Sequence, residues 1–153
     1  MTTSPVIRKA TPADYPALLQ IGHSFFEFNI YRKFTEIDEV SLLRTFHQLA
    51  SEHLLLVLEI DEKIIGTAGA FIAPLYWNHS YLQGLEAFWW IEPEYRNTNL
   101  GNQLRLCLQA DAETKGVQFW NMVALKESMH DIVCQHYERA GMTHVETVFM
   151  KVL

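Results

Sequence analysis

The spacing of apolar residues changes repeatedly along this 153-residue chain, between the period of a strand and that of a helix. Short apolar runs predict buried strands at residues 6–10, 54–58, 64–72, 85–91 and 117–125. Apolar residues three or four positions apart predict helices over 18–26, 40–50, 100–112 and 130–140. Residues 143–153 alternate and predict one or two last strands. This order of elements leaves few folds open.

A strand, a helix and another strand in succession imply a parallel crossover, whereas consecutive strands imply antiparallel hairpins. We therefore expect an α/β fold in one domain over residues 1–153, with a mixed central sheet of six to seven strands and about four helices. Residues 74–83, rich in Tyr, Trp, Asn and His, are expected to form a loop or a strand end. Thr11 with Asp14, and Thr35 with Asp38, have the spacing of helix capping boxes.

The charge balance limits the partners. Twelve Lys and Arg stand against eighteen Asp and Glu, a formal charge of −6, and no basic run is present. Nucleic-acid binding needs clustered cations, so we expect none. The apolar runs are too short to span a membrane and no signal peptide is visible, which favours a cytoplasmic location and no membrane partner. The His residues show no ligand spacing, so no metal is assigned.

The junction at residues 92–102 is the most informative place. A strand ends at Pro93, a polar loop follows, and a helix opens near Leu100. The first N–H groups of such a helix attract anions, and Arg96 adds a charge. Asn97 and Asn99 tolerate left-handed backbone conformations. Many strand-to-helix turns look similar, so these features alone favour a plain turn over an anion site.

The same stretch, Ile91–Gly101 followed by an amphipathic helix, resembles the acetyl-CoA loop of GNAT N-acetyltransferases. That family carries Arg or Gln, two variable residues, Gly, one variable residue, and Gly or Ala. Arg96 and Gly101 fill the outer positions here. Asn99 stands where the first Gly is usual, and Asn97 also replaces a frequent Gly.

The resemblance extends along the chain. Residues 7–14 are similar to the family's first strand and helix start, 63–66 to its third-strand entry, and 137–142 to its late Tyr-x-x-x-Gly-Phe element. The aromatic fourth strand is similar to that of GNAT proteins found in phage and bacterial genomes. By this resemblance the family's acceptor-facing loop is residues 27–36, where Phe28, Tyr31 and Arg32 could touch the acceptor. A homodimer is also possible.

The resemblance implies an enzyme that uses acetyl-CoA as cosubstrate and transfers its acetyl group by direct attack of a primary amine of a small molecule or protein. The backbone around Trp90, Ile91 and Glu92 is then expected to hold the acetyl and pantetheine part. His130 stands where many relatives carry a pantetheine-binding Asn, although it also fits a plain helix start. The expected loop contacts are Arg96, Asn97, Thr98, Asn99, Leu100, Gly101 and Asn102.

Two residues are the catalytic candidates. Tyr137 matches the family's general acid, with a core tyrosine as the alternative. Glu86 is the leading general base, because a carboxylate in an apolar strand is costly unless it is functional, paired or solvated. Glu92 and His79 are weaker bases that would act through water. The opposing hypothesis is a GNAT-shaped binding or structural protein that has lost catalysis, which the two Asn residues motivate.

Overall fold

The computed structural model describes residues 4–153. They fall into two compact units, which divide between Val123 and Ala124. The first carries the whole sheet and three α-helices, and the second carries the last α-helix, α4 (His130–Arg139). The expectation of one domain over residues 1–153 stays a prediction.

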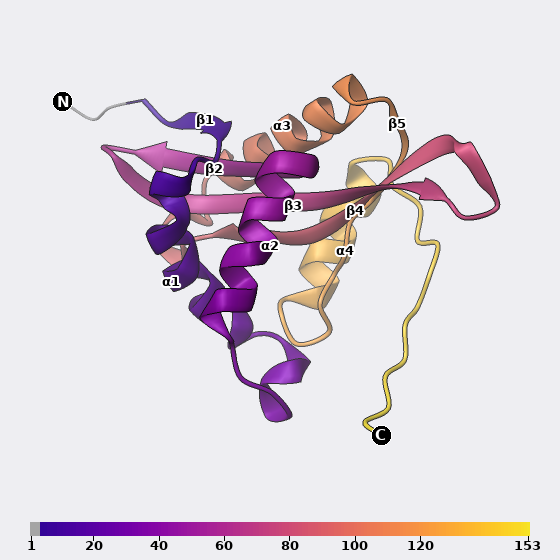
Figure 1. Ribbon diagram of the computed structural model, residues 1–153, viewed down its shortest axis with the longest axis horizontal. Helices are drawn as coiled ribbons and strands as arrows, with labels where there is room; N and C mark the ends of the chain where they lie inside the picture. Colours follow the sequence, from indigo (N-terminus) through magenta and orange to yellow (C-terminus); the bar gives the residue numbers. More distant parts are fainter. Residues whose placement is uncertain (1–3) are drawn as a thin grey trace. The chain divides into compact units, whose positions relative to one another are not determined.

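The sheet has the order β1-β2-β3-β4-β5. Three neighbouring pairs run antiparallel and the last pair, β4 and β5, runs parallel, so the expected mixed sheet is confirmed. The long β3–β4 hairpin projects beyond the other strands (Figure 1). The strands are β1 (Val6–Lys9), β2 (Leu54–Ile60), β3 (Lys63–Leu75), β4 (Asn78–Ile91) and β5 (Val117–Asn121).

The expected strand number is wrong, since the described residues form five strands and not six to seven. Residues 143–153 form no strand, and Val148 and Phe149 are 81% and 91% exposed. An alternating pattern indicates a preference for extended backbone, but a strand also needs a neighbouring strand that pairs with its N–H and C=O groups. Conversely, residues 74–83 belong mainly to the β3–β4 hairpin, where Pro74 pairs with Leu82.

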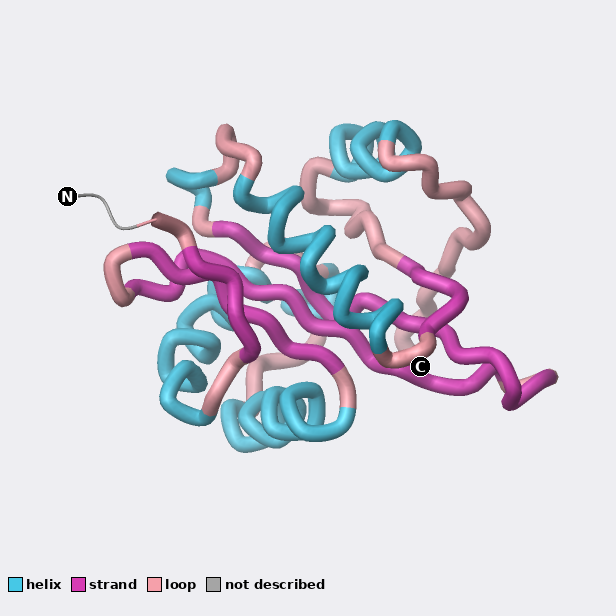
Figure 2. The backbone as a smooth tube through the Cα atoms, turned by 90° about the horizontal axis from the view of Figure 1, so that it is seen from above, coloured by secondary structure: helices cyan, strands magenta, loops and turns pink. Residues whose placement is uncertain are grey.

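Helices cover both faces of the sheet in the first unit. The helices α1 (Tyr15–Phe26) and α2 (Glu39–Glu52) lie on one face and α3 (Leu100–Thr114) on the other (Figure 2). One-turn 3₁₀ helices at Pro12–Asp14, Ile30–Lys33 and Pro93–Tyr95 connect the elements. With α4, the described chain has the expected four α-helices.

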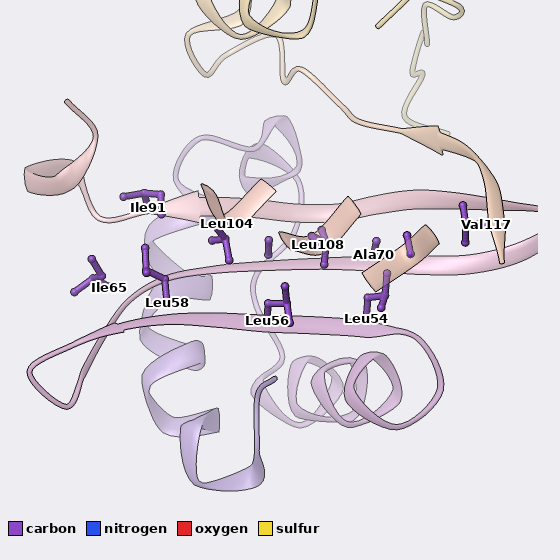
Figure 3. Packing of buried hydrophobic residues seen from close by; sticks show 11 residues of the cluster. Leu54, Leu56, Leu58, Ile65, Ala70, Ile91, Leu104, Leu108 and Val117 are labelled. Carbon is purple, nitrogen blue, oxygen red and sulfur yellow. The ribbon is translucent and has the colours of Figure 1, made fainter. Parts of the chain in front are cut away.

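Each face of the sheet has its own apolar core. The α3 side joins Leu104 and Leu108 to the strands (Figure 3). The α1–α2 side joins Leu18, Phe46 and Leu49 to β2. Trp90 and Ile91, neighbours at the end of β4, are both buried. This double burial fixes the end of β4 firmly, and the candidate loop leaves the sheet from this point.

A bulge in β4 sets which side chains face which core. Phe88 pairs with Gly69, yet the next residue of β3, Ala70, pairs with Glu86, so Ala87 is one extra residue. In a regular strand Glu86 and Phe88 would share a face. The extra residue places Glu86 on the face of Ala70, the α3 side, while Phe88 packs on the α1–α2 side.

Candidate functional site

The strands β4 and β5 separate into a fork after four paired positions. β5 pairs with Leu82 to Leu85 only, and no described strand lies on that side of residues 86–91. At the fork, the Asn121 side-chain amide donates to the Gly84 carbonyl at 3.1 Å. Gly84 allows Trp120 to lie against the strand, since a Cβ there would stand 2.5 Å from the indole ring. The opening of the sheet is therefore held by specific contacts.

Glu86 lies at this fork. Its Oε2 accepts a hydrogen bond from the Val123 backbone N–H at 2.7 Å, just beyond the end of β5. Burial raises the pKa of Glu86 from 4.5 to about 7, because a desolvated carboxylate is disfavoured, and the Val123 N–H offsets only part of this effect. A carboxyl group with a pKa near neutrality is suited to remove a proton from an amine.

The loop after β4 turns tightly into α3. A 3₁₀ turn at Pro93–Tyr95 comes first, and the Thr98 hydroxyl then donates to the Tyr95 carbonyl at 2.6 Å. The first i→i−4 bond of the helix runs from Gln103 N–H to the Asn99 carbonyl at 3.0 Å. The Asn99 side chain makes no capping bond. The Leu100 N–H donates to the Thr98 hydroxyl at 3.3 Å, and the N–H groups of Gly101 and Asn102 that follow have no acceptor within the helix, so they are the ones that could bind an anion.

The two Asn residues do not use the left-handed conformation that their type allows. Asn99 has φ −82°, and the described non-glycine residues with positive φ are Asp61, Glu62 and Met129. Gly101 is also tolerant, because a Cβ there would meet Ile91 at 3.4 Å and Trp89 at 3.6 Å, which are ordinary contacts. This backbone does not need glycine at positions 97 and 99.

Arg96 folds back onto the end of β4. Its Nε donates to the Ile91 carbonyl at 2.9 Å, and its Cζ lies 4.4 Å from the centre of the Trp90 ring, in cation–π contact. Burial lowers the pKa of the guanidinium, while Glu92 raises it. The contact of Arg96 with the cosubstrate stays a prediction, since this side chain packs on Trp90.

The other expected contacts in the first unit lie around the same loop. The Glu92 N–H is used by the sheet, donating to the Ile65 carbonyl at 2.8 Å. The Asn102 side chain accepts from Arg105 at 2.9 Å. Asn97 is exposed, Leu100 is half-buried, and Gly101 accepts a hydrogen bond from the Trp89 indole at 3.0 Å. Residues 90–92 and 96–102 therefore lie on the two sides of the Pro93–Tyr95 turn, between the end of β4 and the start of α3.

Two expected residues belong to the second unit. Tyr137 is 8% exposed on α4. His130 opens that helix, with its Nδ1 3.1 Å from Asp131 and a ring nitrogen 3.7 Å from the Cys134 sulfur. Their roles as acid and pantetheine contact stay predictions. Of the weaker bases, His79 is exposed near the tip of the β3–β4 hairpin, and Glu92 is half-buried beside the loop.

A cavity of about 340 Å³ lies between α1, α2 and the sheet, and the sequence analysis missed it. Its floor includes Thr67 of β3 with Phe88 and Trp90 of β4. Phe28 of the expected acceptor loop packs against Trp90 at 5.6 Å between ring centres, whereas Tyr31 is 51% exposed. The sequence shows apolar stripes on both helices, but only the packing reveals that they leave a space.

A sequence profile of the acetyltransferase (GNAT) family matches residues 18–142, which is most of the chain. The chain belongs to this family. The match includes the fork, the loop and α3, and it ends beyond Tyr137. The GNAT resemblance expected from the sequence is confirmed. A search of curated proteins returns no significant match.

Solved structures share the fold. A transcriptional regulator from Bacillus halodurans C-125 superposes with a TM-score of 0.77 at 19% identity, covering 98% of this chain and 100% of that one. A predicted acetyltransferase with acetyl-CoA from Clostridium acetobutylicum gives 0.75 at 21% identity, covering 97% and 96%. An aminoglycoside acetyltransferase from an uncultured soil metagenomic sample gives 0.72 at 17%, covering 97% and 95%. At these identities the likeness establishes the GNAT fold alone.

No α-helix in the described part of the chain is long and apolar enough to cross a membrane.

Proposed function

We propose that this protein is an acetyl-CoA-dependent N-acetyltransferase that acts on a primary amine. The observation that carries the proposal is the pairing, within one unit, of the α3 N-terminus, where the Asn99 side chain makes no capping bond, with a half-buried carboxyl group of raised pKa at the fork. The first feature suits a pyrophosphate and the second suits a general base. A purely structural role would not require a desolvated carboxyl group at the opening of a sheet.

The residues present fit the cosubstrate. The loop and first turn of α3, residues 97–102, offer backbone N–H groups to its pyrophosphate. The end of β4 at Trp90–Glu92 lies beside the fork and would hold the pantetheine arm. Acetyl-CoA supplies the thioester whose carbonyl carbon receives the amine. Support for this assignment also comes from the Clostridium acetobutylicum neighbour, which carries acetyl-CoA on the same fold.

The protein groups have distinct tasks. Glu86, ionised above pH 7, accepts the proton that the amine loses as its nitrogen bonds to the carbonyl carbon. The carbon–sulfur bond breaks, and Tyr137 gives its hydroxyl proton to the departing thiolate. The protonated Glu86 then returns its proton to solvent, and Tyr137 regains one. No acyl-enzyme forms, so rate acceleration comes from holding both reactants together and from these proton transfers.

A charge placed at the α3 N-terminus tests the cosubstrate site. Asn99→Asp keeps the size of a side chain that makes no capping bond and adds one negative charge beside the expected pyrophosphate. We expect the dissociation constant of acetyl-CoA, measured by calorimetry, to rise about five- to tenfold at low salt, because like charges a few ångströms apart in water cost about 1 kcal/mol. The effect should shrink at high salt.

Asn78→Asp is the matched control. It makes the same charge change at the exposed end of the β3–β4 hairpin, where Asn78 Oδ1 accepts from the Ser80 N–H. This variant should bind acetyl-CoA as the parent does. If the parent itself does not bind acetyl-CoA at millimolar concentration, or if no amine releases free thiol from it, the proposed activity is wrong.

A further inference from the structure

The cavity between α1 and α2 has an interior that is almost wholly apolar. Its volume of about 340 Å³ lies in the range of small-molecule sites. The side chains that line its interior are mostly Leu, Ile and Phe, from both helices and from β4. Such walls hold water poorly, since a buried water needs two to four polar partners. The space is therefore suited to a hydrocarbon group.

Two polar groups inside the cavity already have partners, and a third, the Trp90 indole N–H, is buried without one. The Thr67 hydroxyl donates to the Leu56 carbonyl at 2.8 Å, and the Thr45 hydroxyl donates to the Ser41 carbonyl at 3.1 Å. A sugar or another polyhydroxylated ligand placed there would lose its hydration, and the single indole N–H of Trp90 could not replace it. The interior thus selects against polar ligands.

Polar side chains at the rim of the cavity also have hydrogen-bond partners within the protein. The Asp38 carboxylate caps α2, accepting from the Ser41 N–H and hydroxyl. Asn29 Oδ1 accepts from the Tyr31 N–H at 2.9 Å. Asp38 is the one carboxylate among the lining residues, so a ligand with several ammonium groups finds little charge to pair with.

The position of the cavity connects it to the fork. Phe88 and Trp90 form part of its floor, and they follow Glu86 on the same strand, with Phe88 about 7 Å further along. Beyond Leu85 the sheet ends at β4, because β5 has separated from it. A ligand resting on Phe88 therefore has to pass only the edge of one strand to reach the carboxyl group of Glu86.

We infer that the acceptor is an amine with a hydrophobic carbon skeleton, an alkyl or aromatic group of up to about ten heavy atoms, which lies in the α1–α2 cavity while its amino group lies at the fork beside Glu86. The inference rests on the proposed function and narrows its substrate class. It also gives β4 two tasks, since one strand positions the base and forms the floor under the acceptor.

A homologous series of alkylamines measures how binding depends on the length of the hydrocarbon chain. For ethylamine, butylamine and hexylamine we expect the dissociation constant, measured by calorimetry, to fall about fourfold with each added methylene, which is the effect of burying one methylene group. Ethanolamine and glucosamine should bind more weakly than butylamine. A flat series, or tighter binding of the polar amines, overturns the inference.

A bulky substitution in the cavity wall tests whether the alkylamines bind in the α1–α2 cavity. Thr45→Phe fills the cavity from the middle of α2 and should abolish the dependence on chain length. Gln48→Phe adds the same ring to the exposed side of that helix and should preserve it. Circular dichroism checks the fold, and if Thr45→Phe does not fold, Thr45→Leu makes the same test with a smaller side chain. An unchanged dependence in the folded cavity variant overturns the assignment.

Binding and turnover separate the two proposals. If alkylamines bind with the expected dependence, the cavity assignment stands, and thiol release from acetyl-CoA then decides whether they are acceptors. If glucosamine is acetylated and no alkylamine binds, the proposed function stands and the inference on the acceptor is wrong. If no amine at all releases thiol, the proposed function fails, and the acceptor role fails with it.

Discussion

Replacing Glu86 by Gln should stabilise the protein at alkaline pH while it removes activity. The carboxyl group is desolvated at the fork, and its pKa in the folded protein is about 7 against 4.5 without the surroundings. Gln keeps an oxygen that can accept from the Val123 N–H, which lies 2.7 Å from Glu86 Oε2. The substitution therefore removes the ionisation and preserves the geometry.

The sign of the effect follows from the two pKa values of Glu86. Below pH 4.5 both the folded and the unfolded chain hold the proton, so Glu86 costs nothing. Between pH 4.5 and about 7 the unfolded chain loses its proton first, so the free energy of unfolding falls as pH rises. The total loss is about 3 kcal/mol, from the interval between the two values, and it is complete above pH 7.

Urea unfolding at pH 5 and pH 8, followed by tryptophan fluorescence, measures this difference. Glu86→Gln should be more stable than the parent by up to about 3 kcal/mol at pH 8 and by less than about 1 kcal/mol at pH 5. The parent's kcat/KM should rise with pH up to about 7, whereas the variant should lack this rise and be about 10²–10⁴ slower. An equal stability difference at both pH values would refute the desolvation of Glu86.

Two further substitutions test the fork and the acid. Gly84→Ala places a methyl group 2.5 Å from the ring of Trp120, so we expect a loss of about 1–3 kcal/mol in thermal unfolding. Gly101→Ala meets its nearest neighbour at 3.4 Å and, as the control, should cost nothing. Tyr137→Phe should lower kcat by about 10²-fold or more while the calorimetric affinity for acetyl-CoA is unchanged. Parallel loss of rate and affinity would remove Tyr137 from the acid role.

The elements that bury a periodic stripe could be predicted from the sequence. The four α-helices and the strands through the core were all expected, because burial of one face dictates the spacing of apolar residues. The capping box of the 3₁₀ turn before α1 could also be predicted, since the Asp14 carboxylate accepts from the Thr11 N–H at 2.7 Å. At α2, however, Asp38 itself is the cap, and Thr35 bonds to the Tyr31 carbonyl instead.

Features that depend on a distant partner could not be predicted. Residues 143–153 alternate but have no hydrogen-bonded neighbour strand, and the turn-like residues at 74–83 are paired across a hairpin. The direction of the Arg96 side chain could not be predicted either, because it depends on a contact with the Trp90 ring, whose centre lies 4.4 Å from the guanidinium carbon. Glu86 could be identified from the sequence because a carboxylate is unusual in an apolar strand. Its hydrogen bond from the Val123 N–H could be seen only in the folded structure.

The bulge at Ala87 has a consequence for how this strand can change during evolution. Inserting one residue between Gly69 and Ala70 of β3 would give Ala87 a partner, restore the regular alternation and turn Glu86 to the face of Phe88, toward the α1–α2 cavity. The proton acceptor and the acceptor's carbon skeleton would then compete for the same space. A change of length at the tip of the β3–β4 hairpin leaves this arrangement as it is, whereas the one extra residue of β4 opposite Gly69 and Ala70 has to be kept.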